Sequence, residues 1–299
     1  MDDYAPSNYK LIKRIGEGVH GVVIRAIDLT NNKDVAIKKV SLRTRHGDLS
    51  INAIREIKVL QYCDHENILS LLDIFPDASG MGLVFEYMPC TLHSKIKDPL
   101  HRLSRSCIRS YMKMLLEGLS YMHNLGILHR DIKPANLLIN CNNQLKIADF
   151  GLSRVFDVSN ADKCYSPQVA SRWYRAPELL WGSSKYGPGI DIWASGCVFA
   201  EMLRGVPLFK GKTDIEQLAI VIQTLGSPTI HTWPEVVTLP DYNKISFPPT
   251  KRKKWESVFP TSTKKDEISL IDSLIKYDPK KRLSAKEALS HIYFADNKC

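Results

Sequence analysis

The chain has 299 residues, of which 44% are hydrophobic and 24% are charged, and this composition excludes a disordered chain because it suffices for a sizeable buried core. The formal net charge of +9 is compatible with anionic partners but does not choose among nucleic acid, acidic lipid and small anions. No run approaches the roughly 18 apolar residues that span a bilayer, and the charged N-terminus is typical of neither a secretory nor a transit peptide.

Short β-prone runs dominate the first 90 residues, at 11–16, 21–28, 34–40 and 82–88, with one helical stretch at 51–63. Beyond them the pattern is helical. Apolar residues recur at helical spacing from Ser106 to Met122, with Gly126 as a stop, and 191–203 is apolar nearly all round, which predicts a buried helix. Proline and aromatic residues at 226–262 indicate an insert of loops and short helices. We therefore expect an α+β fold with a small β-rich lobe (1–86) and a larger, mainly helical lobe (87–299).

A glycine-rich turn between two β-prone runs is the first functional candidate: Gly16, Glu17, Gly18, Val19, His20 and Gly21. Glycines let a backbone fold closely over phosphates and offer bare N–H groups to them. The same spacing occurs in dinucleotide-binding folds and in ordinary turns. A dinucleotide-binding turn opens a helix, whereas a strand follows here, which favours a hairpin that covers a nucleotide.

Lys38 and Lys39 follow each other in an apolar strand, so alternation directs one of them inward and the other into water. An inward lysine needs an anionic partner. Phosphate oxygens would supply one, and Glu56 would hold the ammonium group in position. The alternative is a surface lysine and a solvated helical glutamate.

Three motifs then follow in order: HRDIKPAN at 129–136, DFG at 149–151 and APE at 176–178. In phosphoryl transfer, a carboxylate at Asp131 orients a hydroxyl nucleophile, and Lys133 balances charge on the moving group. Asn136 and Asp149 offer the hard oxygens that Mg²⁺ prefers. A single aspartate could equally cap a turn, but the three motifs together predict phosphoryl transfer.

With these motifs the chain resembles a eukaryotic protein kinase domain from about Tyr9 to Phe294. The lysine at position 133 of the HRDIKPAN motif resembles the pattern of serine/threonine kinases. Asp191 resembles the kinase residue that anchors the catalytic loop. Arg282 resembles the late kinase arginine that would pair with the APE glutamate, here Glu178. SRWYRAPE (171–178) and the insert resemble the cyclin-dependent and MAP kinase (CMGC) branch. Within it, the degenerate cyclin-binding helix (50–56), EGVHG (17–21) and LPDYNKISF (239–247) resemble the cell-cycle-related kinases, a cyclin-dependent-kinase-like group linked to cilia.

The resemblance implies a serine/threonine protein kinase with ATP and Mg²⁺ as cofactors. Its catalytic residues would be Asp131, Lys133, Lys38 and Glu56, with Mg²⁺ on Asn136 and Asp149. Glu86, Tyr87 and Met88 would form the hinge whose main chain contacts adenine, with Phe85 as the gatekeeper behind it. The residues implied to bind ATP are Ile15, Gly16, Glu17, Gly18, Val19, His20, Gly21, Val23, Ala36, Lys38, Phe85, Glu86, Met88, Asn136, Leu138 and Asp149.

The resemblance also implies an activation segment at 149–178 with Ser166 as its phosphosite. The phosphate would be gathered by Arg55, Arg130 and Arg154, which without the motifs would be ordinary solvated arginines. It would order the segment and draw the helix bearing Glu56 inward. Ser171 is expected to hydrogen-bond near Asp131 and Lys133.

Three departures limit this resemblance. Val19 and His20 replace inhibitory phosphosites of cyclin-dependent kinases, and Gln168 replaces the second activating phosphosite of MAP kinases, so we expect neither form of control. The degenerate helix leaves cyclin dependence open.

The implied partners are substrates with Ser/Thr-Pro, MAK-type ciliary kinases among them, an upstream activating kinase, and a cyclin or another activating subunit. We expect no nucleic acid and no membrane insertion. KRKK (251–254) is either a docking or nuclear-entry patch or a solvated loop, and the solvated loop is favoured.

The implied role is in cilium assembly and length control and in cell-cycle signalling. The alternatives are a pseudokinase-like scaffold, which the presence of Lys38, Asp131 and Asp149 disfavours, and a cell-cycle kinase activated by a cyclin. The seven scattered cysteines indicate reduced thiols and a cytoplasmic or nuclear protein, with the cilium as a further location.

Overall fold

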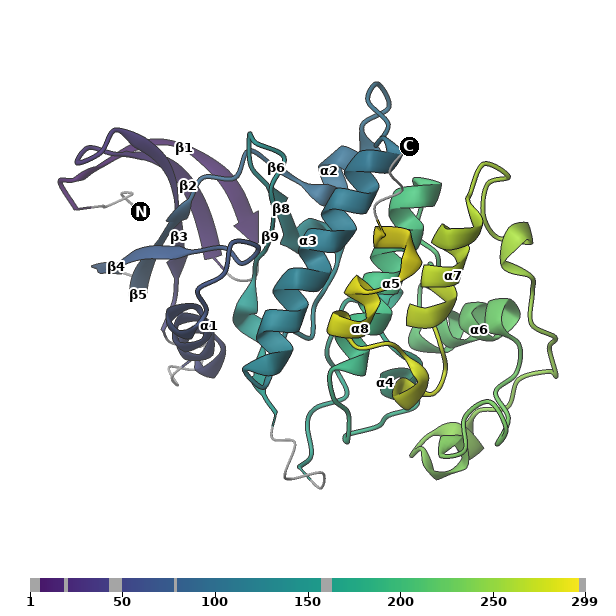
Figure 1. Ribbon diagram of the computed structural model, residues 1–299. Coiled ribbons are helices and arrows are strands. Elements are labelled where there is room, and N and C mark those ends of the chain that lie inside the picture. Colours follow the sequence, from purple (N-terminus) through teal and green to yellow (C-terminus); the bar gives the residue numbers. More distant parts are fainter. Residues whose placement is uncertain (1–5, 19–20, 43–49, 78–79, 157–162, 296–299) are drawn as a thin grey trace.

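The computed structural model describes residues 6–18, 21–42, 50–77, 80–156 and 163–295. An antiparallel sheet with the strand order β1-β2-β3-β5-β4 forms the N-terminal lobe, and helices form most of the rest (Figure 1). The strands are β1 (Tyr9–Gly18), β2 (Gly21–Asp28), β3 (Lys33–Val40), β4 (Leu71–Asp77) and β5 (Gly80–Glu86). The predicted α+β arrangement of two lobes is confirmed.

The strand β4 is the one large element of this sheet that the apolar pattern did not predict. Its sequence, LLDIFPD, interrupts alternation with Asp73 and contains Pro76. A proline removes a hydrogen-bond donor, but β4 lies at the edge of the sheet and pairs only with β5. The edge position therefore tolerates a sequence that a central strand would exclude.

Helix α1 (Ile51–Tyr62) packs below the sheet and matches the predicted helix within one residue (Figure 1). The Ser50 side chain caps it by accepting from the Ala53 N–H. Ala53 and Leu60 are buried, and Glu56, which lies between them on the same helical face, is only 4% exposed. The packing of α1 therefore turns a carboxylate inward.

The C-terminal lobe is built around α3 (Arg105–Asn124) and α5 (Gly189–Arg204). Every residue of α5 from Ile190 to Met202 is buried, as its all-round apolar sequence predicts. The other helices are α2 (Leu92–Lys97), α4 (Pro177–Leu180), α6 (Asp214–Leu225), α7 (Lys265–Leu274) and α8 (Ala285–Leu289). The region 226–262 forms loops and short 3-10 turns, as predicted.

Two small sheets carry the segments between the lobes. One has the order β6-β8-β9, from β6 (Cys90–Thr91), β8 (Leu137–Ile139) and β9 (Leu145–Ile147), and the other pairs β7 (Ile127–Leu128) with β10 (Arg154–Val155). The Ile147 N–H donates to the Asn67 carbonyl at 2.8 Å, which joins the two lobes behind the hinge. The catalytic motifs therefore lie on short connections fixed at both ends.

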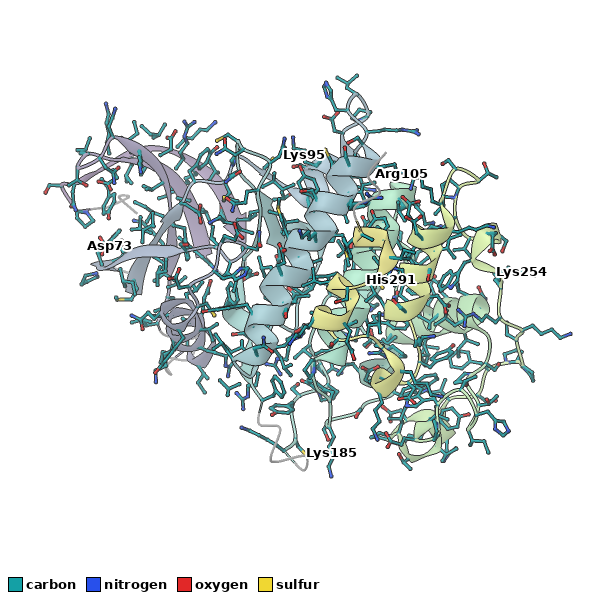
Figure 2. All side chains as sticks on the ribbon, in the orientation of Figure 1. Asp73, Lys95, Arg105, Lys185, Lys254 and His291 are labelled. Carbon is teal, nitrogen blue, oxygen red and sulfur yellow. The ribbon has the colours of Figure 1, made fainter. Side chains whose placement is uncertain are left out.

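The basic run 251–254 is exposed, and Lys254 points outward on the side of the molecule remote from the sheet (Figure 2). Arg252 pairs with Asp272 and lies over the Trp255 ring. The solvated-loop interpretation stays a prediction. None of the helices in the described ranges is long and apolar enough to cross a membrane.

Candidate active site

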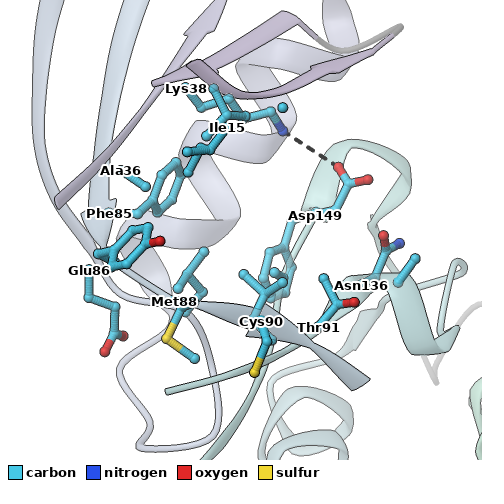
Figure 3. A pocket seen from close by; sticks show the side chains of 18 of the residues that line it. Ile15, Ala36, Lys38, Phe85, Glu86, Met88, Cys90, Thr91, Asn136 and Asp149 are labelled. Carbon is cyan, nitrogen blue, oxygen red and sulfur yellow. Dashed lines mark ion pairs between the residues drawn. The ribbon is translucent and has the colours of Figure 1, made fainter. Parts of the chain in front are cut away.

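A cavity of about 690 Å³ lies between the lobes, with the sheet above it and the small sheet β6-β8-β9 below (Figure 3). The predicted residues that line it are Ile15, Gly16, Glu17, Gly21, Val23, Ala36, Lys38, Glu56, Phe85, Glu86, Met88, Lys133, Asn136, Leu138 and Asp149. Gly18 ends β1 opposite Gly21, so the glycine turn connects two strands as predicted. Val19 and His20 lie outside the described residues.

Tyr87, the middle residue of the predicted hinge, lines the cavity as well. Sequence reasoning missed a second set of lining residues: Leu60, Leu69, Pro89, Cys90, Thr91, Ala135, Ala148 and Phe150. Some had a usable signal. Leu60 follows Glu56 by one helical turn, and Pro89 to Thr91 continue the hinge. Leu69 had none, because it enters the cavity from the connection before β4.

Lys38 is the inward lysine of the pair on β3. Its Nζ lies 2.6 Å from Glu56 Oε1. It also lies 3.6 Å from Asp149 Oδ1 (Figure 3). The buried Glu56 carboxylate therefore fixes the ammonium group at the cavity wall, with the second carboxylate close by. The structure shows α1 in its inward position.

Lys39 corrects one prediction, because it does not point into water. Its side chain is only 12% exposed and its Nζ lies 3.0 Å from Asp77 Oδ1. The physical reason is β4, the unpredicted edge strand, which carries a buried carboxylate to this face of the sheet. Both lysines of β3 therefore have carboxylate partners.

The main chain before Asp131 is anchored by Asp191 on α5. Its carboxylate accepts the N–H groups of His129 and Arg130 at 2.9 and 2.8 Å, and its Oδ2 lies 3.0 Å from His123 Nε2. Burial acts to raise the pKa of Asp191, yet the contacts with His123 and His129 outweigh it and hold the pKa below its ordinary value. The predicted anchor is confirmed.

Asp131 is 5% exposed and both of its oxygens accept hydrogen bonds. Oδ2 contacts Lys133 Nζ at 2.7 Å and Asn136 Nδ2 at 3.0 Å. Oδ1 accepts from the N–H and the hydroxyl of Ser171, at 2.9 and 3.0 Å. Ser171 Oγ also accepts from Lys133 Nζ at 2.9 Å, so the expected contacts of Ser171 are confirmed.

Asn136 and Asp149 fit a Mg²⁺ ion by the chemistry of their oxygens. Asn136 Nδ2 donates both to the main-chain oxygen of Asp131 and to its Oδ2, which fixes the side chain and leaves its amide oxygen for the cavity. Among the described residues there is no group of three or more His, Cys, Asp or Glu that could hold a metal. A site with two protein oxygens suits Mg²⁺, because Mg²⁺ usually keeps water and phosphate oxygens as its other ligands.

The activation segment is held at its end by the predicted pair of Glu178 and Arg282. Two parallel hydrogen bonds of 2.7 Å join the guanidinium to the carboxylate, and both side chains are buried. Burial lowers the pKa of Arg55, and the charges of Arg154 and Arg130 lower it further, while the gathering of a phosphate by these three arginines stays a prediction. Ser166 is exposed, and its phosphorylation stays a prediction.

The hinge residue Glu86 turns its side chain away from the cavity floor toward the C-terminal lobe. Its Oε1 lies 2.7 Å from Lys146 Nζ on β9 and accepts from the Ser70 N–H at 3.3 Å. Lys146 is 8% exposed. An ion pair between a buried ammonium group and a carboxylate side chain that is 28% exposed therefore joins the hinge to the β8–β9 hairpin.

The cavity, the paired lysine and the carboxylate loop are those of a phosphotransferase, and the protein kinase domain family matches residues 9–294. The chain belongs to the protein kinase family and is a serine/threonine kinase of the cyclin-dependent branch. It is 47% identical to cyclin-dependent kinase 20 of Danio rerio over 96% of this chain and 83% of that protein. It is 44% identical to cyclin-dependent kinase 20 of Homo sapiens over 96% of this chain and 82% of that protein. It is 42% identical to cyclin-dependent kinase D-1 of Arabidopsis thaliana over 94% of this chain and 69% of that protein.

Proposed function

We propose that the chain transfers the terminal phosphoryl group of Mg²⁺-bound ATP to Ser or Thr hydroxyls that precede proline in other proteins. The observation that carries this is one cavity bordered by Lys38, Asn136 and Asp149, next to a buried Asp131. Lys38 would bind the inner phosphates while Glu56 holds it. Asn136 and Asp149 would hold Mg²⁺, which neutralises phosphate charge when bound.

Asp131 would orient the substrate hydroxyl and accept its proton, and Lys133 would stabilise charge on the transferred group. Because the transition state is loose, most of the rate would come from position and electrostatics. The hydrogen bonds of Ser171, Lys133 and Asn136 to Asp131 support this, since they fix the carboxylate in one orientation.

The preference for proline is supported by the main chain before Ser171. Ala170 has a φ of 63°, and Arg175 occupies the carbonyls of Val169 and Ala170, each at 2.9 Å. A substrate residue beside this segment finds both carbonyls already bound, which leaves its own N–H without a partner. Proline has no N–H and avoids that loss.

The test is transfer of radiolabelled phosphate from ATP and Mg²⁺ to paired Ser-Pro and Ser-Ala peptides, for wild type and Asp131→Asn. We expect transfer to Ser-Pro alone, and at least a ~100-fold lower rate in the variant at unchanged thermal stability. Equal transfer to both peptides would refute the proline preference. ATP binding without transfer, from chain treated with an activating kinase, would favour the scaffold instead.

For regulation, we propose that phosphorylation of Ser166 activates the chain through Arg55, Arg130 and Arg154. The electrostatic influence of Arg130 and Arg154 on Arg55 supports it, because a phosphate adds about −1.5 to −2 charges that the three would bind. A cyclin remains a candidate partner, because exposed Ile51 and Tyr62 on α1 offer apolar surface, at 67% and 80% exposure. Equal activity of Ser166→Ala and wild type after treatment with an activating kinase would contradict the role of Ser166.

The physiological proposal follows from the resemblance to the cell-cycle-related kinases. We propose that the chain phosphorylates MAK-type ciliary kinases in their activation segments and acts in cilium assembly and length control and in cell-cycle signalling. We propose a location in the cytoplasm, the nucleus or both, with the cilium as a further location. A tagged chain should restore cilium length in cells that lack the endogenous protein, whereas Asp131→Asn should not. Full rescue by the variant would refute a catalytic role there.

A further inference from the structure

The hydroxyl of Tyr186 joins the predicted phosphosite to the catalytic loop. Tyr186 is half-buried in the connection between α4 and α5. Its oxygen accepts a hydrogen bond from Arg130 Nη1 at 2.9 Å and donates one to the main-chain oxygen of Ser166 at 2.6 Å. Two segments that are distant in the chain are thereby connected through one atom.

Further contacts fix Tyr186 against the activation segment. Its ring packs against that of Tyr165 with 5.4 Å between centroids, and the Tyr165 N–H donates to the Ser184 carbonyl at 2.7 Å. Burial raises the pKa of Tyr186 above its ordinary value, which keeps the phenol protonated and able to donate. Donation and acceptance by one hydroxyl polarise each other, which strengthens both hydrogen bonds.

Arg130 depends on such contacts. It is 6% exposed, its φ of 69° lies in the left-handed region, and its Nε donates to the Leu152 carbonyl at 2.6 Å. Among the described residues, that carbonyl and the Tyr186 hydroxyl are the acceptors within hydrogen-bond distance of the guanidinium. A buried charged donor that loses its acceptor is destabilised. The Tyr186 hydroxyl therefore restrains Arg130, the residue directly before Asp131.

We propose that Tyr186 is a positioning residue that holds Arg130 and Asp131 in place while Ser166 is unmodified, and that a phosphate on Ser166 takes over this function. The inference rests on the proposed role of Ser166 as the activation site. Phosphate oxygens are stronger acceptors for a guanidinium than a neutral phenol. The hydroxyl should therefore matter before phosphorylation and be dispensable after it.

The experiment compares wild type, Tyr186→Phe and the matched control Tyr165→Phe in the full chain, each with alanine or phosphoserine at position 166. The Tyr165 hydroxyl has no hydrogen bond in the described part of the chain, so this control removes the same atom from the neighbouring ring. The readouts are the turnover number on a Ser-Pro peptide and amide hydrogen exchange of residues 128–131 and 164–170.

With alanine at 166, we expect Tyr186→Phe to lower the turnover number about tenfold and to speed exchange in both segments, since a hydrogen bond to a charged group is lost. With phosphoserine, Tyr186→Phe should match wild type in both readouts, and Tyr165→Phe should match it throughout. If Tyr186→Phe matches wild type in hydrogen exchange and turnover number with alanine at 166, the proposal is overturned. An equal loss of turnover with alanine and with phosphoserine would also overturn it, because the hydroxyl would then have a structural role only. No transfer by wild type in either state would instead refute the proposed function, and the exchange data would still decide the role of Tyr186.

Discussion

At the scale of single residues, Asp131 is defined by its contacts, because both of its oxygens are occupied by donors from the C-terminal lobe. Ser171 supplies two of these donors, and its hydroxyl also accepts from Lys133. One side chain therefore keeps the carboxylate and the ammonium group at a fixed separation. Ser171 stands two residues before Trp173, in the segment that would face the substrate.

Replacing Ser171 tests this arrangement. Ser171→Ala removes one hydrogen bond to the Asp131 carboxylate, and we expect the turnover number to fall about tenfold at unchanged thermal stability. Ser171→Thr keeps the hydroxyl and should retain most of the activity. Steady-state kinetics on one peptide decide it, and a Ser171→Ala enzyme as fast as wild type would show that Lys133, Asn136 and the main-chain N–H of residue 171 suffice to hold Asp131.

Residue roles were predictable where a motif fixes several residues at once, as for Lys38, Asp131 and Asp149. Tyr186 was not, because it lies 56 residues from Arg130 and outside every motif. Lys39 was placed in water because strand alternation describes the faces of one strand but not what a neighbouring strand brings to each face. Such contacts depend on the tertiary fold.

At the scale of elements, the pair of Glu178 and Arg282 joins the end of the activation segment to the 3-10 turn before α8. Arg282 also donates to the Gly189 carbonyl at 2.8 Å, at the start of α5. Three elements from different parts of the chain therefore meet at one buried guanidinium.

Removing this guanidinium should be costly, because it leaves a buried carboxylate without its partner. We expect Arg282→Leu to lower the free energy of unfolding by about 3–5 kcal/mol. Lys280→Ala, which removes an exposed partner of Glu235, should leave the unfolding midpoint unchanged. Denaturant titrations of Arg282→Leu and Lys280→Ala measure the two free energies of unfolding. Equal unfolding midpoints for the two variants would show that the buried pair contributes little to stability.

Helix α5 also carries Glu201 into the core, where its Oε2 accepts from the Tyr174 hydroxyl at 2.6 Å. Burial raises the pKa of Glu201, although this hydrogen bond opposes the shift. Between the ordinary and the raised pKa, the native chain keeps a proton that the unfolded chain has released. The free energy of unfolding therefore falls as the pH rises through this window.

The glutamine of Glu201→Gln is neutral at every pH, so the substitution should remove this decrease in the free energy of unfolding. The stability of the variant should therefore rise relative to that of wild type as the pH rises. The measurement is the urea midpoint between about pH 5 and pH 8. Glu256→Gln, an exposed counterpart, should follow wild type. Parallel curves for Glu201→Gln and wild type would mean that the carboxylate is ionised in the native chain.

At the scale of the whole molecule, the cavity belongs to neither lobe alone, because the strands supply its roof and the hinge and β8–β9 hairpin its floor. A ligand that contacts both surfaces stabilises their assembly by mass action, by about 2.7 kcal/mol at a concentration of 100 times its dissociation constant.

Asp149→Asn tests the metal's share of this stabilisation. Wild type should melt at a higher temperature with ATP, and higher still when Mg²⁺ is added. The variant should lose the increment that depends on Mg²⁺, because an amide is a weaker ligand for a hard cation. Thermal scans with ATP plus Mg²⁺ and with ATP plus a chelator separate the contribution of ATP from that of Mg²⁺. If Mg²⁺ raises the melting temperature of the variant as much as that of wild type, the metal binds elsewhere.

The two-lobed architecture was predictable because alternation and helical periodicity change abruptly near residue 90 and because α5 is apolar all round. The edge strand β4 was not, since Asp73 and Pro76 disguise it. The small sheets of two or three residues per strand are too short to leave a pattern, and they form because the long elements hold their ends together.

The ion pair of Glu86 with Lys146 has a consequence for the speed of the catalytic cycle. If ADP forms in the cavity between the lobes, opening of the lobes would draw the Glu86 carboxylate away from the Lys146 ammonium group, which now lie 2.7 Å apart. We therefore expect this ion pair to restrain the hinge and to lengthen the residence time of ADP. Lys146→Met should shorten that residence time, which stopped-flow release of a fluorescent ADP measures directly.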